Sequence, residues 1–168
     1  MNPLLVNVAE LLRRPGSDKH LDTTVPAVEL HLDEPRISPD AEVAVVATLE
    51  SMSDGIVVHA RIDVPWHDSC RRCLTELDHT AHADVRELYQ VAVTADDAFP
   101  IVGEQLDLTE MVRASILLEL PLAPLCRDDC AGICPSCGAN RNEQACACST
   151  AVTDDRWSAL DALREQLN

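Results

Sequence analysis

Eight cysteines are the residues of this 168-residue chain whose type and spacing could support chemistry. They form four close pairs, Cys70/Cys73, Cys126/Cys130, Cys134/Cys137 and Cys146/Cys148. The first and the third pair have the spacing Cys-x-x-Cys. Two thiolates at such a spacing can hold one zinc ion within a tight turn, and Pro135 and Gly138 supply the bend that this turn needs. Because structural zinc takes four ligands in tetrahedral geometry, each pair requires a second pair.

The preferred arrangement has two zinc ions with four cysteine ligands each: Cys70, Cys73, Cys126 and Cys130 for the first, and Cys134, Cys137, Cys146 and Cys148 for the second. The second set is the stronger candidate, because it closes within about fifteen residues and so short a segment buries almost nothing without a metal. A rival arrangement places Cys130, Cys134, Cys137 and Cys148 around a single ion. The sequence therefore predicts one or two Zn²⁺ ions, and a disulfide framework or free thiols are the alternatives to metal.

Two features favour a soluble, cytoplasmic protein. Residues 1–17 lack a basic start, and Asn7 and Glu10 interrupt their apolar stretch, unlike a secretory signal. No run approaches the ~18 consecutive apolar residues of a membrane-spanning helix. Thiols stay reduced inside the cell, where clustered cysteines usually bind metal.

Charge and composition limit the partners that we expect. The chain has 13 Lys plus Arg against 29 Asp plus Glu, which gives a formal net charge of -16. Such a chain repels the phosphates of nucleic acid, and with 2% aromatic residues it lacks the stacking surfaces of single-strand binders. We therefore expect basic protein partners and neither direct nucleic-acid binding nor membrane binding.

Outside the cysteines, few residues suggest a site. None of the five glycines builds a phosphate-binding loop, a dinucleotide fingerprint or a nucleophile elbow. His79 and His82 are three apart in an expected strand and so point to opposite faces, and His67 is expected to be an exposed loop histidine. The acidic residues of 96–107 lack the spacing of a calcium loop. We predict no catalytic residue and no enzyme activity.

Alternating apolar residues predict the strands that position the first cysteine pair. Residues 42–50 and 56–66 alternate with a period of two, and Ser53-Asp54-Gly55 between them is typical of a tight hairpin turn. Residues 77–89 predict the next strand of a meander, which places the first cysteine pair at a hairpin tip. Residues 28–32 alternate in the same way and predict an earlier strand.

Helices are expected at three places. Residues 94–105 predict a surface loop, and the longest of the three helices follows it. Asp107 can cap a helix over 108–120, with Glu110 completing a reciprocal cap. Residues 8–14 predict a turn or two of helix, and residues 154–167 have the spacing of a short amphipathic helix.

Together these elements predict an α+β fold. An antiparallel β-meander or partial barrel packs on a buried helix, followed by a C-terminal zinc-knuckle segment and a terminal short helix. We expect two domains: residues 1–125, which carry the hairpin tip with Cys70 and Cys73, and residues 126–168, the cysteine-rich zinc-binding segment with the terminal helix.

Five segments of the chain, taken in their order along the sequence, resemble the motifs of one protein family. They are Cys70-Arg71-Arg72-Cys73-Leu74, Arg86-Glu87-Leu88, the helix end Leu118 to Leu122, the run Asp129 to Gly138, and Asp155 to Leu160. The chain is similar, over nearly its whole length from about Leu4, to the YceD-type large ribosomal RNA subunit accumulation protein family, as an actinobacterial-type member. It departs from the family at Asp155, which is usually proline, and at Arg141-Asn142, which is often Leu-Asn.

The resemblance implies a factor that supports accumulation or processing of large-subunit (23S) ribosomal RNA, with no catalytic centre. The negative charge adds that such a factor meets ribosome biogenesis through basic ribosomal or assembly proteins. The alternative is a thiol-based redox sensor or zinc-regulated chaperone, in which oxidation ejects zinc. A nucleic-acid-binding zinc ribbon is a weaker rival, because residues 121–150 carry a net charge of -1.

Overall fold

The computed structural model describes residues 2–94 and 96–148, and they form two compact units. The first unit comprises residues up to 68 together with 76–124, and the second comprises 69–75 together with the chain from 125 onward. The chain therefore enters the second unit twice, once at a hairpin tip and once after the last helix of the first unit.

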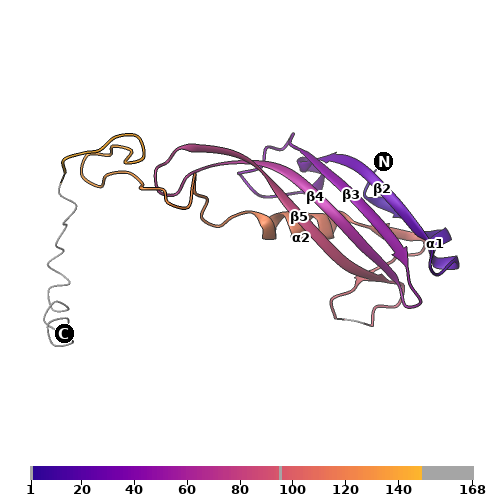
Figure 1. The fold of residues 1–168 in the computed structure, drawn as a ribbon. Helices are drawn as coiled ribbons and strands as arrows, with labels where there is room; N and C mark the ends of the chain where they lie inside the picture. Colours follow the sequence, from indigo (N-terminus) through magenta and orange to yellow (C-terminus); the bar gives the residue numbers. More distant parts are fainter. Residues whose placement is uncertain (1, 95, 149–168) are drawn as a thin grey trace, which may run out of the picture. The chain divides into compact units, whose positions relative to one another are not determined.

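A five-stranded sheet in the order β2-β3-β4-β5-β6 forms the first unit (Figure 1). Its strands are β2 (Asp18–Pro26), β3 (Glu42–Ser51), β4 (Ile56–Ser69), β5 (Glu76–Gln90) and the short β6 (Phe99–Pro100). β2 and β4 pair antiparallel with β3, and β6 pairs parallel with β5. The order β3, β4, β5 is the predicted meander, and β2 adds a strand beside β3.

Alternation of buried and exposed residues follows the predicted period of two in β3 and β4. In β3 the inward residues Val43, Val45 and Leu49 are 0% exposed, and in β4 the facing Ile62 and Val58 are at most 1% exposed. The register pairs Val45 with Ile62 and Leu49 with Val58. One face of the sheet is therefore apolar and forms the core of this unit.

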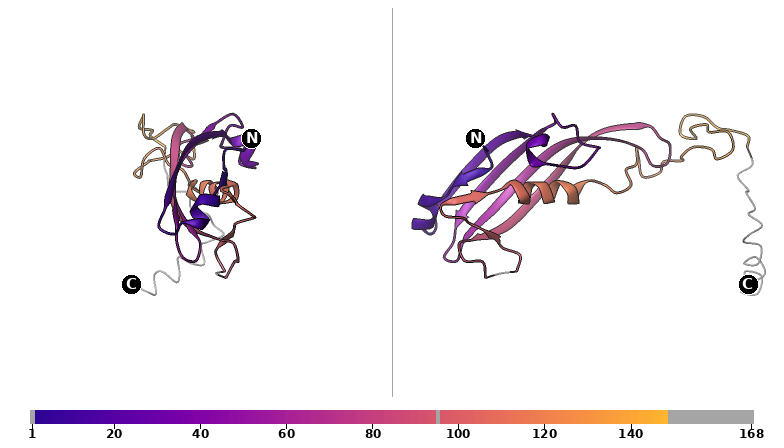
Figure 2. Two further views of the ribbon diagram at one scale, coloured as in Figure 1. Left: turned by 90° about the vertical axis from the view of Figure 1, so that its right-hand side faces the viewer. Right: turned by 180° about the vertical axis from the view of Figure 1, so that it is seen from behind.

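The helix α2 (Thr109–Glu119) covers that apolar face, packing against β5 and the short 3₁₀ helix η1 (Ala27–Leu30) (Figure 2). Its buried residues include Met111, Val112 and Ile116, whereas Leu118 is 87% exposed. The Asp107 carboxylate accepts a hydrogen bond from the Thr109 N–H at 2.9 Å. Nη1 of Arg113 lies 3.6 Å from the Glu110 carboxylate, and within the described residues this carboxylate makes no hydrogen bond to the backbone at the start of α2, so the reciprocal half of the predicted cap is wrong.

Three further short elements belong to this unit. β1 (Leu5–Asn7) pairs antiparallel with β7 (Gln105–Asp107), and α1 (Ala9–Arg13) is the predicted short helix. β6 and the start of β7 lie within residues 94–105, so the prediction of a loop over this whole range is wrong. β7 pairs with β1 near the other end of the chain, and β6 pairs with the end of β5, and neither pairing is visible in an apolar period of the strand itself.

The predicted strand over residues 28–32 is also wrong. The chain forms η1 there, because Ala27 and Leu30, one 3₁₀ turn apart, both point into the core while Val28 is 60% exposed. The first strand of the sheet is instead β2, nine residues that end at Pro26. The predicted terminal helix over 154–167 lies outside the described residues. Among the helices that the structure describes, none has the length and apolar content to cross a membrane.

Candidate metal centres

The first pair of cysteines sits at the tip between β4 and β5, as predicted. The backbone N–H of Cys70 donates to the Thr75 carbonyl at 2.8 Å, and that of Leu74 donates to the Cys70 carbonyl at 2.9 Å. Leu74 has a positive φ of 61°, which lets the chain reverse within the tip. Cys70 and Cys73 are both buried.

The second pair, Cys126 and Cys130, completes a tetrad with the tip. Sγ of Cys70 lies 3.8 Å from Sγ of Cys130, and Sγ of Cys73 lies 3.6 Å from Sγ of Cys126. All four sulfur atoms lie within 4.8 Å of one another. Four sulfurs around a tetrahedral zinc at about 2.3 Å are separated by roughly 3.8 Å, whereas a disulfide needs about 2.05 Å. The geometry thus fits a zinc ion and excludes a disulfide in this structure.

The second tetrad consists of Cys134, Cys137, Cys146 and Cys148, whose sulfurs also lie within 4.8 Å of one another. The Cys134 N–H donates to the Ala139 carbonyl and the Gly138 N–H to the Cys134 carbonyl, both at 2.8 Å. Gly138 has φ +74°, which closes this knuckle. Only Cys134 of the four is buried.

The structure thus brings together the two groups of four that the sequence spacing favours. The rival set of Cys130, Cys134, Cys137 and Cys148 draws its members from both groups. Within the described residues, these two groups alone bring at least three histidine, cysteine or carboxylate side chains into range of one ion. The metal-binding role of the eight cysteines stays a prediction.

Burial and hydrogen bonds together give the thiols of each tetrad unequal pKa values. Burial raises the pKa of Cys70, but backbone N–H groups of Cys126 and of the tip outweigh it and lower the pKa to about 6. Backbone N–H groups, that of Cys137 first, lower the pKa of Cys134 to about 6. Hydrogen bonds to Cys137 and Cys134 raise the pKa of Cys148 to about 12. A divalent cation would remove this conflict between neighbouring thiols, because it favours all four thiolates at once.

Two polar side chains that sequence reasoning missed support the first tetrad. Arg72 donates from Nη1 to the Cys130 carbonyl at 3.1 Å and to the Asp128 carbonyl at 3.3 Å. Asn142 donates from Nδ2 to Sγ of Cys130 at 3.3 Å. No spacing rule points to either residue, since both bonds join segments that are distant in sequence.

Cysteines are four of the five buried residues that the structure describes in the second unit. Its buried residues, among those described, are Cys70, Cys73, Cys130, Gly132 and Cys134. Among the described residues, all members of the hydrophobic core belong to the first unit. The second unit therefore has no buried aliphatic or aromatic side chain within its described part, which is the situation in which a metal supplies the folding free energy.

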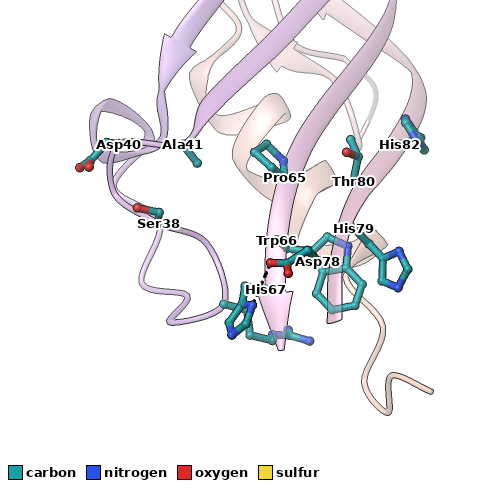
Figure 3. Close-up of a pocket in the computed structure, with 11 residues that line it drawn as sticks. Ser38, Asp40, Ala41, Pro65, Trp66, His67, Asp78, His79, Thr80 and His82 are labelled. Atoms are coloured by element: carbon teal, nitrogen blue, oxygen red, sulfur yellow. Dashed lines mark hydrogen bonds and ion pairs between the residues drawn. The ribbon is translucent and has the colours of Figure 1, made fainter. Parts of the chain in front are cut away.

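The first unit carries a hollow of about 870 Å³ with no cysteine in its wall. Figure 3 shows His67 on β4 beside Asp78 on β5, with Nδ1 and Oδ1 2.9 Å apart. This hydrogen bond raises the pKa of His67. His67 is exposed, as expected, but it lies in a strand and not in a loop.

Residues 58–164, which include all eight cysteines, match the family described as "Large ribosomal RNA subunit accumulation protein YceD". The chain belongs to the YceD family. The resemblance inferred from the sequence motifs is therefore confirmed.

Proteins similar to this chain occur in bacteria and in plants. An uncharacterized protein of Mycobacterium tuberculosis is 30% identical over 174 residues, which cover 95% of this chain and 80% of the relative. One from Mycobacterium leprae is 28% identical over 83% of this chain and 68% of its own. An Arabidopsis thaliana protein, named large ribosomal RNA subunit accumulation protein YCED homolog 1, chloroplastic, is 33% identical over 41% of this chain and 22% of its own. No solved structure matches the chain.

Proposed function

We propose that this YceD-family protein supports accumulation of large-subunit ribosomal RNA as a non-enzymatic, zinc-stabilised binding protein in the cytoplasm. The observation that supports this proposal best is the make-up of the second unit: its eight cysteines form two tetrads of sulfur atoms, and its described part has no buried aliphatic or aromatic side chain. An interior of this kind suits a structural role for the metal, because four protein ligands leave no open coordination position for a substrate.

The partners that we propose are basic ribosomal or ribosome-assembly proteins. Each four-cysteine zinc centre contributes a net charge of -2, so two centres would take the chain from -16 to about -20. A charge of this size speeds association with cationic surfaces and opposes direct contact with phosphates.

Complementation in a deletion strain tests the cellular role. Loss of the protein should lower the ratio of large-subunit to small-subunit ribosomal RNA, and the wild-type chain should restore it. Cys134→Ser should fail to restore the ratio, whereas Ser136→Ala, an exposed non-ligand position in the same knuckle, should succeed. An unchanged ratio in the deletion strain would refute the role, and full rescue by Cys134→Ser would refute the need for zinc.

A binding experiment tests the class of partner. Zinc-loaded protein is mixed with purified total ribosomal proteins and, separately, with large-subunit ribosomal RNA at a series of salt concentrations. We expect binding to the proteins that weakens with salt, and no tight RNA complex. Tight RNA binding with a steep salt dependence, and no bound protein, would contradict the proposal.

The second candidate function is a thiol redox sensor, which the exposure of Cys126 and Cys137 favours. Mild peroxide should then release zinc together with a gain of chaperone or signalling activity. Release without such a gain leaves the structural role as the explanation of both tetrads.

A further inference from the structure

Asn142 lies in the loop between Cys137 and Cys146 of the second tetrad, but its side chain contacts the segment that carries Cys130 of the first. Its Nδ2 donates to Sγ of Cys130 at 3.3 Å. Its Oδ1 accepts from the N–H of Ala131 and from Nη2 of Arg127, both at 2.8 Å. The second tetrad's loop therefore supplies a hydrogen bond to a sulfur of the first tetrad.

The orientation of this amide is fixed by four hydrogen bonds. Nδ2 makes a second bond to Oδ1 of Asn140 at 2.8 Å, so both donors and both acceptor positions of the Asn142 amide are occupied. Turning the amide by 180° would place its oxygen against a thiolate and its nitrogen against two donors, Ala131 N and Arg127 Nη2.

Backbone pairing holds the same two segments together. The Arg141 N–H donates to the Gly132 carbonyl at 2.9 Å, and Ile133 and Asn140 form an antiparallel bridge. The Ile133 N–H in turn donates to the carbonyl of Arg72 in the hairpin tip at 3.0 Å. A continuous set of hydrogen bonds thus connects the second tetrad's loop, the Cys130 segment and the tip.

We propose that Asn142 is a positioning residue that couples the two metal centres. An ion at the second tetrad orders the loop that carries Asn142, and the Asn142 N–H then stabilises the Cys130 thiolate, so the first tetrad binds its own ion more tightly. This inference rests on the proposed zinc centres. Coupling of binding free energies is reciprocal, so an ion at the first tetrad also strengthens binding at the second.

Zinc titrations of the full chain, with competing chelators of known affinity, test the coupling. Asn142→Ala should still bind two zinc ions but with about 10- to 100-fold weaker affinity at the first centre, the usual effect of losing a hydrogen bond to a metal ligand. Asn142→Asp, which keeps the acceptor oxygen and loses the donor, should weaken the same centre. Gln144→Ala, an exposed position in the same loop, is the matched control and should change neither centre.

The same substitution in a Cys134→Ser variant separates coupling between the two centres from an effect of Asn142 on the first centre alone. In Cys134→Ser the second centre is broken, so the first centre should already be weak and Asn142→Ala should add little. Cadmium-substituted protein gives an independent readout, since the cadmium resonance of the first centre should shift in Asn142→Ala.

Three results would overturn the inference. Asn142→Ala with unchanged first-centre affinity removes the positioning role, and losses that add fully in the double variant remove the coupling. Both results leave the proposed zinc centres standing. A wild-type chain that binds fewer than two zinc ions overturns the metal centres themselves, and this inference with them.

A separate observation concerns a hollow of about 450 Å³ in the first unit, where Phe99, Pro100 and Val102 form an apolar wall with Leu5. Val102 is 74% exposed and Leu5 46% exposed. Tyr89 is 0% exposed and stacks on Phe99 with ring centroids 5.1 Å apart. The hollow is large enough for an apolar side chain.

The charged residues that line this hollow are both acidic. Asp107 and Glu110 contribute carboxylates, and no Lys or Arg is among the lining residues. Arg113 approaches Glu110 at 3.6 Å from the next turn of α2. We infer that the hollow binds the apolar side chain of a basic protein segment, whose flanking Lys or Arg side chains meet the two carboxylates. This inference rests on the proposed function and names where its partner docks.

A short peptide with a leucine between two pairs of lysines is the probe, titrated into isotope-labelled, zinc-loaded full chain. Amide resonances of residues 99–110 should shift, and Val102→Asp should weaken binding at least about tenfold. Leu118→Asp, at an exposed apolar position outside the hollow, should leave affinity unchanged. Equal binding of a peptide with serine in place of leucine, or equal losses in the two variants, would overturn the docking site. A peptide that binds here, together with no capture of basic ribosomal proteins, would instead overturn the proposed function.

Discussion

Backbone conformation at single residues holds the segments of the first tetrad together. Gly132 has φ +72°, and a Cβ there would lie 3.1 Å from the carbonyl oxygen of Arg72. That carbonyl accepts the hydrogen bond from Ile133, so the close approach is part of how the tip meets the Cys130 segment. Gly138 has a similar φ of +74° but no atom within 4 Å of a Cβ.

Gly132→Ala should therefore weaken zinc binding at the first centre more than Gly138→Ala weakens it at the second. Both variants meet the left-handed backbone cost of roughly 1–2 kcal/mol, but only Gly132→Ala also displaces a neighbouring carbonyl. Chelator competition on each variant gives the comparison. Equal losses at the two centres would show that the Arg72 contact contributes nothing.

The hydrogen-bonded pair of His67 and Asp78 makes stability depend on pH. The hydrogen bond to Asp78 raises the pKa of His67, so the folded chain holds this proton more tightly than the unfolded chain does. Its contribution to stability is therefore complete below the ordinary pKa of histidine and is lost as pH rises through the raised value. In an NMR titration, Asp78→Asn should lower the pKa of His67. Asp84→Asn, which removes the partner of Arg61 instead, should leave it unchanged.

Cysteine spacing predicted which sulfur atoms lie together, but it did not predict the residues that surround them. Cysteine spacing indicates which sulfurs can share an ion, because zinc imposes four ligands and a short loop limits which pairs can meet. Arg72 and Asn142 carry no such signal. Their roles come from hydrogen bonds across 58 and 12 residues of sequence, which exist only once the segments are folded together.

Among the elements, the strands β3, β4 and β5, whose residues alternate, were predictable, whereas β2 was not. β3 and β4 alternate cleanly because one face is buried and the other exposed. β2 has a single buried residue, Val25, so its nine residues show no apolar period, and it is recognisable only through its pairing with β3. In residues 28–32 the apolar residues have the spacing of a strand, but the chain forms a turn of 3₁₀ helix there.

The helix α2 provides a test of the buried core of the first unit. Ile116→Ala should lower the free energy of unfolding by about 2–5 kcal/mol, because Ile116 is 1% exposed and its removal leaves a cavity. Leu118→Ala, two residues along the same helix at an 87% exposed position, should change it by no more than ~0.5 kcal/mol. Urea unfolding measures both, and similar losses would contradict the assignment of the buried face.

For the whole molecule, the two units should respond differently to metal removal. The first unit has an aliphatic core, whereas the buried residues described in the second are cysteines and one glycine. A chelator should therefore collapse the amide resonances of 69–75 and 125–148 to unfolded positions and leave those of β3, β4 and α2 dispersed. Loss of both sets together would show that the first unit depends on the metal, and loss of neither would show that the second unit folds without it.

The double entry of the chain into the second unit also affects the order of folding. Cys70 and Cys130 are 60 residues apart, and the residues between them include β5, β6, β7 and α2. During synthesis, the first tetrad is complete only after all of these elements have left the ribosome. An ion bound by the first tetrad links the two ends of the chain segment between Cys70 and Cys130. Like a reversible crosslink, it lowers the entropy of the unfolded chain. Metal capture at the first tetrad would thus follow, and mark, completion of the first unit.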